Sequence, residues 1–117
     1  IDDTFNANPA GAQAALARLA RLAPGGRRVV VTPGMVELGP VQAEENRRLA
    51  AGAARVASVV LVVGRTNRTA LVAGASSAGT AEVIVVPSRE EAVAWVRAHL
   101  GDGDAVLYEN DLPDHYP

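Results

Sequence analysis

The densest group of polar side chains in this sequence is the stretch DDTFNANP, residues 2–9. It holds two adjacent acids, Asp2 and Asp3, and two amides, Asn6 and Asn8, before a proline that suits the first turn of a helix. Asn8 alone is explained well enough as a helix cap. Two acids at the end of an apolar strand are harder to explain, because a carboxylate needs water or a partner. The stretch therefore predicts one wall of a polar cleft.

Three more polar stretches follow apolar runs, namely TPGMVELG (32–39), GRTNR (64–68) and YENDLPDHYP (108–117). In the first, Met35 and Leu38 are expected to pack beneath the loop, which leaves Glu37 as the candidate for contact with a ligand. In the second, Arg65 and Arg68 flank a helix start and suit an anion, although surface arginines often have no such role.

The last stretch offers a weak metal signal, and the chain lacks the usual catalytic motifs. Asp111, Asp114 and His115 could hold a metal, but a single histidine at flexible spacing favours a solvated tail. The sequence contains no G-x-S-x-G elbow, no G-x-G-x-x-G and no G-x-x-x-x-G-K-[ST] loop. It also contains no lysine, so a lysine that binds phosphate must come from elsewhere. We expect no catalytic residue and no metal site in this chain.

Short valine-rich runs alternate with segments of helical period along the whole chain. Such runs are typical of parallel strands covered on both faces, and we expect them over 28–32, 58–63, 82–86 and 104–108, with the end of another over 1–4. Helices are expected from Pro9 to a stop at Pro24, from Pro40 through Val56, over 67–75, and from a Ser88-x-x-Glu91 capping box to Gly101.

This alternation predicts an α/β fold with a three-layer, doubly wound, mostly parallel sheet of about five to six strands, in other words a Rossmann-like domain. Ligands of such sheets bind beyond the carboxyl ends of the strands. The polar stretches should therefore gather along one rim. The loops at the opposite end, APGG (23–26) and GDGD (101–104), are expected to be plain turns.

Length and composition favour one domain, with 117 residues, 49% hydrophobic residues and a net charge of −2. The absence of a basic field argues against nucleic acid and acidic membranes as partners. The chain has no cysteine, and its apolar runs are too short to cross a bilayer. Because it opens on Ile1, we expect residues 1–117 to be a single domain excised from a longer chain.

The quoted motifs have a familiar pattern. DDTFNANP before a helix, followed by VVVTPGMVELGPVQAEENRRLA (29–50), resembles the C-terminal domain of the Mur ligases. The likeness is greatest to the type that adds D-alanyl-D-alanine to UDP-N-acetylmuramoyl-tripeptide. That type carries the segments Asp-Asp-Ser-Tyr-Asn-Ala-Asn-Pro and Gly-Asp-Met-Leu-Glu-Leu-Gly.

The resemblance implies a cytoplasmic, three-domain ligase of peptidoglycan precursor synthesis. Such an enzyme uses ATP and Mg²⁺ to form an acyl phosphate, which an amine then attacks. This chain would be the third domain, which closes over ATP and positions the amine. Its partners would be the N-terminal and central ATP-binding domains, a UDP-linked muramoyl peptide, and an amino acid or dipeptide. The phosphate loop and metal ligands belong to the central domain, so the isolated chain is expected to be inactive and to bind no cofactor tightly.

The resemblance also implies roles for individual residues. Asp2, Asp3, Asn6 and Asn8 would face the nucleotide, and Glu37 would lie nearby. The candidates for positioning the substrate are Glu37, Arg65, Arg68, Glu109, Asn110 and Asp111.

Two departures from the family pattern affect the substrate. Pro33-Gly34 replaces Gly-Asp, and the acidic segment 108–114 replaces a basic stretch that resembles Lys-Gly-Ser-Arg. An acidic segment suggests a different, cationic amine, or no conventional contact with the acceptor.

Two other functional classes can use a similar α/β scaffold. A receiver-type signalling domain would need an aspartate after the third strand and a lysine after the fifth, where this chain has Gly64-Arg65 and Tyr108-Glu109. A non-catalytic α/β interaction or regulatory module on the same scaffold stays open as the alternative.

Overall fold

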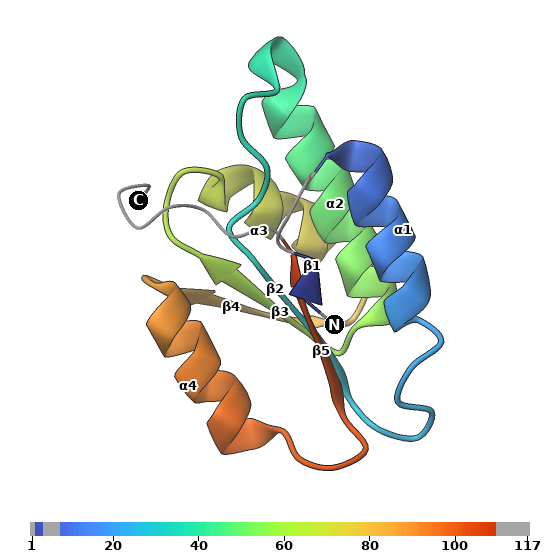
Figure 1. Cartoon of the computed structure of the whole chain (residues 1–117). Helices are drawn as coiled ribbons and strands as arrows, with labels where there is room; N and C mark the ends of the chain where they lie inside the picture. The colour runs from blue at the N-terminus through green and yellow to red at the C-terminus, as the bar shows by residue number, and fades with distance from the viewer. Residues whose placement is uncertain (1, 4–7, 110–117) are drawn as a thin grey trace.

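The computed structural model describes residues 2–3, as backbone, and residues 8–109. Strands and helices alternate along them as the hydrophobic pattern predicts (Figure 1). The strands are β1 (Asp2–Asp3), β2 (Arg28–Thr32), β3 (Val59–Val63), β4 (Glu82–Val86) and β5 (Ala105–Glu109). The helices are α1 (Pro9–Leu19), α2 (Gln42–Val56), α3 (Arg68–Ser77) and α4 (Arg89–His99), and a 3-10 turn, η1 (Gly39–Val41), precedes α2.

Within these residues the strands form one five-stranded sheet in the order β1-β5-β2-β3-β4, and every neighbouring pair is parallel. Helices α1, α2 and α3 cover one face of the sheet and α4 covers the other (Figure 1). The three-layer, doubly wound α/β prediction is confirmed, with five strands in the described part of the chain.

Each face of the sheet carries its own hydrophobic core, because successive side chains of a strand point to opposite faces. The central strands β2 and β3 contribute to both cores, which explains why they are apolar at nearly every position. The core beneath α1, α2 and α3 includes Leu16, Leu19, Val30, Leu49, Val60, Leu71 and Leu107. The core beneath α4 includes Val29, Val31, Leu61, Val86 and Ala92.

Strand β4 differs from the prediction of burial on both faces. It forms one edge of the described sheet, so another strand adjoins it on one side only. Val85 is consequently 42% exposed, and Val83 and Ile84 are only half-buried. An apolar run thus overstated the burial of this strand, because valine is also favoured in strands whose surface is only partly covered.

The expected helix starts are confirmed at two positions. The Asn8 side chain accepts a hydrogen bond of 2.7 Å from the Gly11 amide, and the Ser88 hydroxyl accepts one of 3.2 Å from the Glu91 amide. Helix α1 ends at Leu19, short of the predicted stop, and the chain then turns through Ala23 at a φ of 51°. Among the described helices, of which α2 is the longest at 15 residues, none has the length and apolar character of a membrane span.

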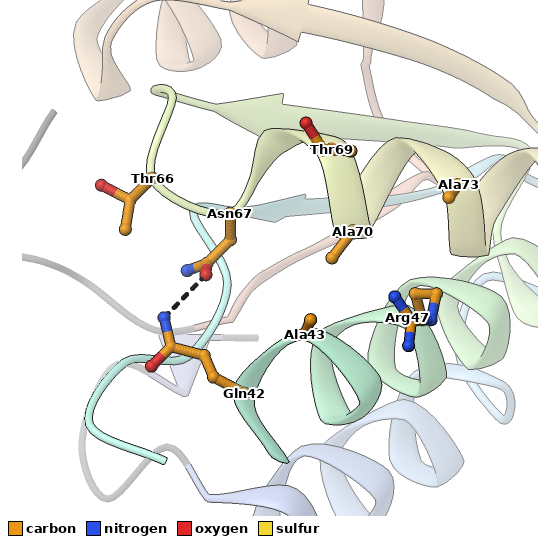
Figure 2. Close-up of a pocket in the computed structure, with 8 residues that line it drawn as sticks. All are labelled: Gln42, Ala43, Arg47, Thr66, Asn67, Thr69, Ala70 and Ala73. Carbon is orange, nitrogen blue, oxygen red and sulfur yellow. Dashed lines mark hydrogen bonds between the residues drawn. The ribbon is translucent and has the colours of Figure 1, made fainter. Parts of the chain in front are cut away.

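Helices α2 and α3 cross closely, side by side on the same face of the sheet (Figure 2). Gly74 of α3 makes this approach possible. A Cβ atom built on Gly74 would overlap the carbonyl oxygen of Arg47 and lie 2.9 Å from Arg47 Cα. Both obstructing atoms belong to backbone, so neither can move aside by changing a rotamer.

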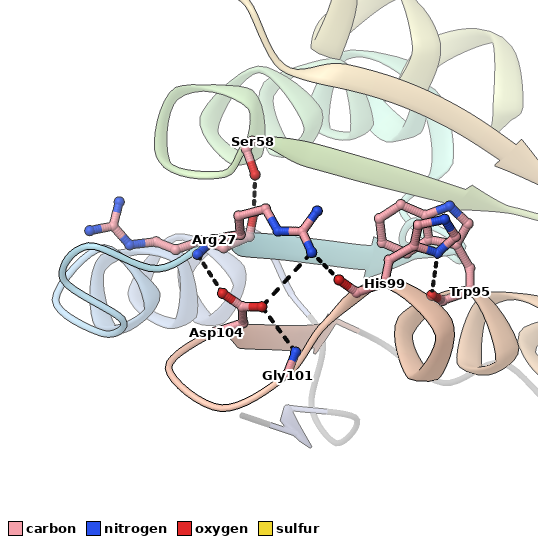
Figure 3. Close-up of polar contacts among 7 residues, drawn as sticks. Arg27, Ser58, Trp95, His99, Gly101 and Asp104 are labelled. Atoms are coloured by element: carbon pink, nitrogen blue, oxygen red, sulfur yellow. Dashed lines mark hydrogen bonds and ion pairs between the residues drawn. The ribbon is translucent and has the colours of Figure 1, made fainter.

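The turns at the opposite end of the sheet were expected to be plain, and instead they are tied together (Figure 3). The Asp104 carboxylate accepts hydrogen bonds from the amides of Arg27 at 2.8 Å and Gly101 at 3.0 Å. The Arg27 guanidinium donates to the carbonyl of His99, whose ring stacks on Trp95 at 4.2 Å between centroids. We call this set of contacts the Asp104 tie.

The Asp104 tie gives stability a dependence on pH. The hydrogen bonds from the Arg27 and Gly101 amides hold the pKa of Asp104 below its ordinary value. Because the pKa is lower in the folded state, the stabilisation is present above about pH 4 and disappears as the pH falls through the folded-state pKa. We expect Asp104→Asn to lower the free energy of unfolding at pH 7 and to lose most of that difference near pH 2, as measured by urea denaturation.

Asp102→Asn is the matched control, because Asp102 is an exposed carboxylate of the same turn. A deficit of Asp104→Asn that stayed constant from pH 7 to pH 2 would contradict this account of the tie.

Candidate functional site

The predicted rim exists among the described residues. Asp3 pairs with Glu109 and Val63 with Val86, each at the carboxyl end of its strand, and Thr32, the last residue of β2, pairs with Val62, one residue before the end of β3. In a parallel sheet these ends share one edge. The segments that follow β1, β2, β3 and β5 therefore all begin along this edge.

The β2–α2 loop, residues 33–38, forms part of the rim and is held by side chains of α2 and of the residue before α3. The Asn46 side chain of α2 accepts a hydrogen bond from the Met35 amide at 2.8 Å and donates to the Met35 carbonyl at 2.9 Å. Asn46 also donates to the Gln42 carbonyl at 3.0 Å, and its side chain is fully buried. An amide of α2 thus binds both backbone groups of a single loop residue.

A second amide reaches the same loop from the start of α3. Asn67 Nδ2 lies 3.1 Å from the Pro33 carbonyl oxygen and 3.2 Å from the Met35 carbonyl oxygen. Its Oδ1 accepts a hydrogen bond from Gln42 Nε2 at 2.9 Å (Figure 2). Asn67 is only 6% exposed. We call Gln42, Asn46 and Asn67 the amide clamp.

Sequence reasoning missed the amide clamp as a functional element. One signal was available, because Asn46 lies three residues before Leu49 and seven before Ala53, on the buried stripe of α2. An amide on such a stripe must find hydrogen-bond partners, and the loop backbone supplies them. The interaction between Gln42 and Asn67 has no comparable signal, since it joins residues 25 positions apart.

The loop carries two residues in the left-handed region of φ. Gly34 has a φ of 84°, and Glu37 has a φ of 63°. Glu37 is exposed, whereas Met35 is 1% exposed and packs into the core as predicted. A left-handed conformation is uncommon for glutamate, and such strained residues cluster at functional sites. This conformation is independent support for singling out Glu37.

The other sequence candidates lie at different places along the rim. Arg65 is exposed, and Arg68 is half-buried, with its Nε donating to the Gly64 carbonyl at 3.0 Å. Asn8 caps α1, which is the structural role that the sequence offered for it. Glu109 ends β5 with a fully buried side chain.

Several candidates have no described side chain. Asp2 and Asp3 are described as the backbone of β1, beside Tyr108 and Glu109. The remaining sequence candidates lie outside the described residues: Asn6, Asn110, Asp111, Asp114 and His115.

A hollow of about 300 Å³ opens beside the amide clamp, between α2 and α3 (Figure 2). Gln42 and Asn67 form its polar end, and small side chains such as Ala70 and Ala73 form its wall. Arg47 at its border pairs with Glu44 at 2.8 Å, and this contact holds the pKa of Glu44 below its ordinary value. The hollow thus adjoins the loop without offering an acid–base pair of its own.

Comparison with known proteins gives a consistent result. A family profile described as Mur ligase, glutamate ligase domain, matches residues 1–108. The UDP-N-acetylmuramoyl-tripeptide--D-alanyl-D-alanine ligase of Mycobacterium leprae (strain TN) is 34% identical to this chain, in an alignment that covers 92% of this chain and 24% of that protein. The chain thus spans about a quarter of the length of this relative.

Two solved structures share the fold. The MurF ligase from Thermotoga maritima in complex with ADP superposes with a TM-score of 0.70 at 24% identity, over 92% of this chain and 23% of that one. MurF from Acinetobacter baumannii superposes with a TM-score of 0.72 at 24% identity, over 92% of this chain and 24% of that one.

Proposed function

The chain belongs to the Mur ligase family, as its C-terminal, glutamate ligase domain, and from that premise we propose that it serves an ATP-dependent, amide-forming ligase of peptidoglycan precursor synthesis. The full-length protein would be a cytoplasmic enzyme with N-terminal and central ATP-binding domains. It would join a UDP-linked muramoyl peptide to an amino acid or dipeptide. Support comes from the name of the M. leprae relative and from the ADP bound to the T. maritima structure.

The observation that carries the proposal is the rim of the sheet, where Glu37 stands exposed on a loop fixed by the amide clamp. A carboxylate held there suits the ammonium group of an incoming amine. We assign substrate positioning to Glu37, Arg65, Arg68, Glu109, Asn110 and Asp111, and contact with the nucleotide to Asp2, Asp3, Asn6 and Asn8.

The chemistry of ATP and Mg²⁺ belongs to the rest of the enzyme in this proposal. No group of three or more histidine, aspartate or glutamate side chains in the described part of the chain converges as a metal site. Mg²⁺ would neutralise charge on the transferred phosphoryl group, and ligands from the central domain would hold it. The residues of this domain would orient the amine and exclude water.

The full-length protein encoded by the native gene tests the function. Purified enzyme given ATP, Mg²⁺, UDP-N-acetylmuramoyl-tripeptide and D-alanyl-D-alanine should release phosphate only when both substrates are present. Residues 1–117 alone should release none. A native gene without an upstream G-T-N-G-K-T-like loop, or a full-length protein that releases no phosphate with D-alanyl-D-alanine or with a cationic amino acid, would instead favour the interaction module.

Because the backbone of Glu37 is strained, one substitution can distinguish the contribution of this residue to function from its contribution to stability. Glu37→Gly should leave the free energy of unfolding unchanged or raise it by up to about 1 kcal/mol, because glycine adopts a positive φ without strain. The same change should lower the kcat/KM of the full-length ligase for the amine about tenfold or more, since it removes the carboxylate. Thermal unfolding and steady-state kinetics measure the two effects.

Ala23→Gly is the matched control, because Ala23 has a φ of 51° at the opposite end of the sheet. It should change stability in the same direction and leave the kinetics at the wild-type level. If Glu37→Gly retained wild-type kinetics, Glu37 would lose its assignment.

A further inference from the structure

We propose that the amide clamp is a positioning device for Glu37, and that Gln42, Asn46 and Asn67 set where its carboxylate meets the incoming amine. This inference rests on the proposed function. It concerns Gln42, Asn46 and Asn67, which the proposed function does not place in contact with the substrate. It assigns these residues an effect on substrate binding as well as on folding.

The clamp holds the loop at both ends of the segment that carries Glu37. Asn46 and Asn67 together bind the amide and the carbonyl of Met35 at 2.8–3.2 Å. The Leu38 amide lies 3.4 Å from Gln42 Oε1. Only Val36 and Glu37 span the interval between these anchors, so the anchors determine the course of the backbone at Glu37.

The contacts come from two separate helices, and burial makes these hydrogen bonds costly to lose. Asn46 belongs to α2 and Asn67 immediately precedes α3, and their exposed fractions are 0% and 6%. In such a dry setting a hydrogen bond is strong, and a lost donor leaves a carbonyl without compensation by water. The bond from Gln42 to Asn67 joins the starts of the two helices. The arrangement therefore fixes the loop against the two helices together.

The backbone conformation of the loop supports the same conclusion. A positive φ at Glu37 is costly for a free loop to adopt, and it persists when the surroundings determine it. The clamp surrounds Gly34 closely, since a Cβ atom there would lie 2.8 Å from both Asn46 Oδ1 and Asn67 Nδ2. Holding a substrate contact within a fraction of an ångström is the usual task of such supporting residues.

Exchanging a carboxamide for a carboxylate tests the clamp at nearly constant volume. Asn67→Asp in the full-length ligase removes the donor to the Pro33 and Met35 carbonyls and turns an acceptor toward them. Gln42→Met is the milder variant, since Gln42 is only half-buried. Gln13→Glu is the matched control, an exposed carboxamide on α1.

Two measurements are made under conditions where circular dichroism shows every variant to be folded. Hydrogen exchange of the peptide that covers residues 33–41 should accelerate in Asn67→Asp and in Gln42→Met and stay unchanged in Gln13→Glu. The KM for the amine should rise about tenfold or more in Asn67→Asp, while the KM for ATP stays within about twofold. A purely structural role would not separate these two constants.

Lowering the pH should partly restore amine binding in the Asn67→Asp variant. Burial raises the pKa of a carboxyl group, and the protonated form regains one O–H donor. The amine-binding defect of Asn67→Asp should therefore shrink as the pH falls toward 6, whereas that of Asn67→Leu should not.

The outcomes distinguish the two proposals. An inactive wild-type enzyme contradicts the proposed function. An active wild-type enzyme, with an unchanged KM for the amine in both Asn67→Asp and Gln42→Met, overturns the positioning role alone. If Asn67→Asp does not fold, Gln42→Met decides between the outcomes by the same two measurements.

Discussion

Gly74→Ala should lower the free energy of unfolding by about 3 kcal/mol or more, because the added methyl group meets backbone atoms of a neighbouring helix. The added Cβ atom would overlap the Arg47 carbonyl oxygen of α2, so the two helices must separate. Separation would open the core around Leu49 and Leu71, which are both fully buried at this crossing. Urea denaturation followed by circular dichroism measures the loss.

Gly101→Ala provides the comparison for Gly74→Ala. No atom lies within 4 Å of a Cβ atom built on Gly101, and its φ is not positive. Its stability should stay within about 0.5 kcal/mol of the wild type. Equal stabilities of the two variants would mean that the helices do not cross as closely as described.

Gly34→Ala should lower the kcat/KM of the full-length ligase for the amine about 100-fold, the magnitude expected when a substrate contact moves by about 1 Å. The new methyl group would lie 2.8 Å from Asn46 Oδ1 and 2.9 Å from Asn67 Cβ, and the residue would keep a φ of 84° that alanine disfavours. The loop can relieve both problems only by leaving the clamp, and Glu37 then moves with it.

Gly25→Ala controls for the backbone strain alone. Gly25 has the same φ of 84°, open space around its Cβ position, and a place in the turn at the opposite end of the sheet. It should lose stability through strain and keep wild-type kinetics. Kinetic losses of similar size in both variants would trace the effect to general destabilisation and would exclude a specific movement of the loop.

Much of the fold could be predicted from the sequence because its signals are local. Valine-rich runs, the Asn8-Pro9 start and the Ser88-x-x-Glu91 box each depend on residues a few positions apart, and the structure confirms the strands and both caps. The resemblance to the Mur ligases is confirmed as well. The exposure of β4 was not predictable in this way, since burial depends on which strand lies at the edge.

The sequence predicted where the candidate site lies, but it did not predict all of the residues that form it. The rule that ligands bind beyond the carboxyl ends of parallel strands predicted the rim, and the segment TPGMVELG predicted Glu37 as a candidate. The unusual φ of Glu37 is visible only in the structure. Most contacts of the amide clamp join residues 11 to 34 positions apart, which no local pattern encodes. The proposed contacts of Asn6, Asn110 and Asp111 stay predictions, because these residues lie outside the described part of the chain.

The position of the Asp104 tie has a practical consequence for engineering. Each interior strand is five residues long, so the tie and the amide clamp stand roughly 16 Å apart at opposite edges of the sheet. Substitutions separated by that distance, with no shared neighbours, combine additively. Stability to heat or acid can therefore be changed by substitutions at the Asp104 tie, without altering turnover, which depends on the loop at the opposite end of the strands.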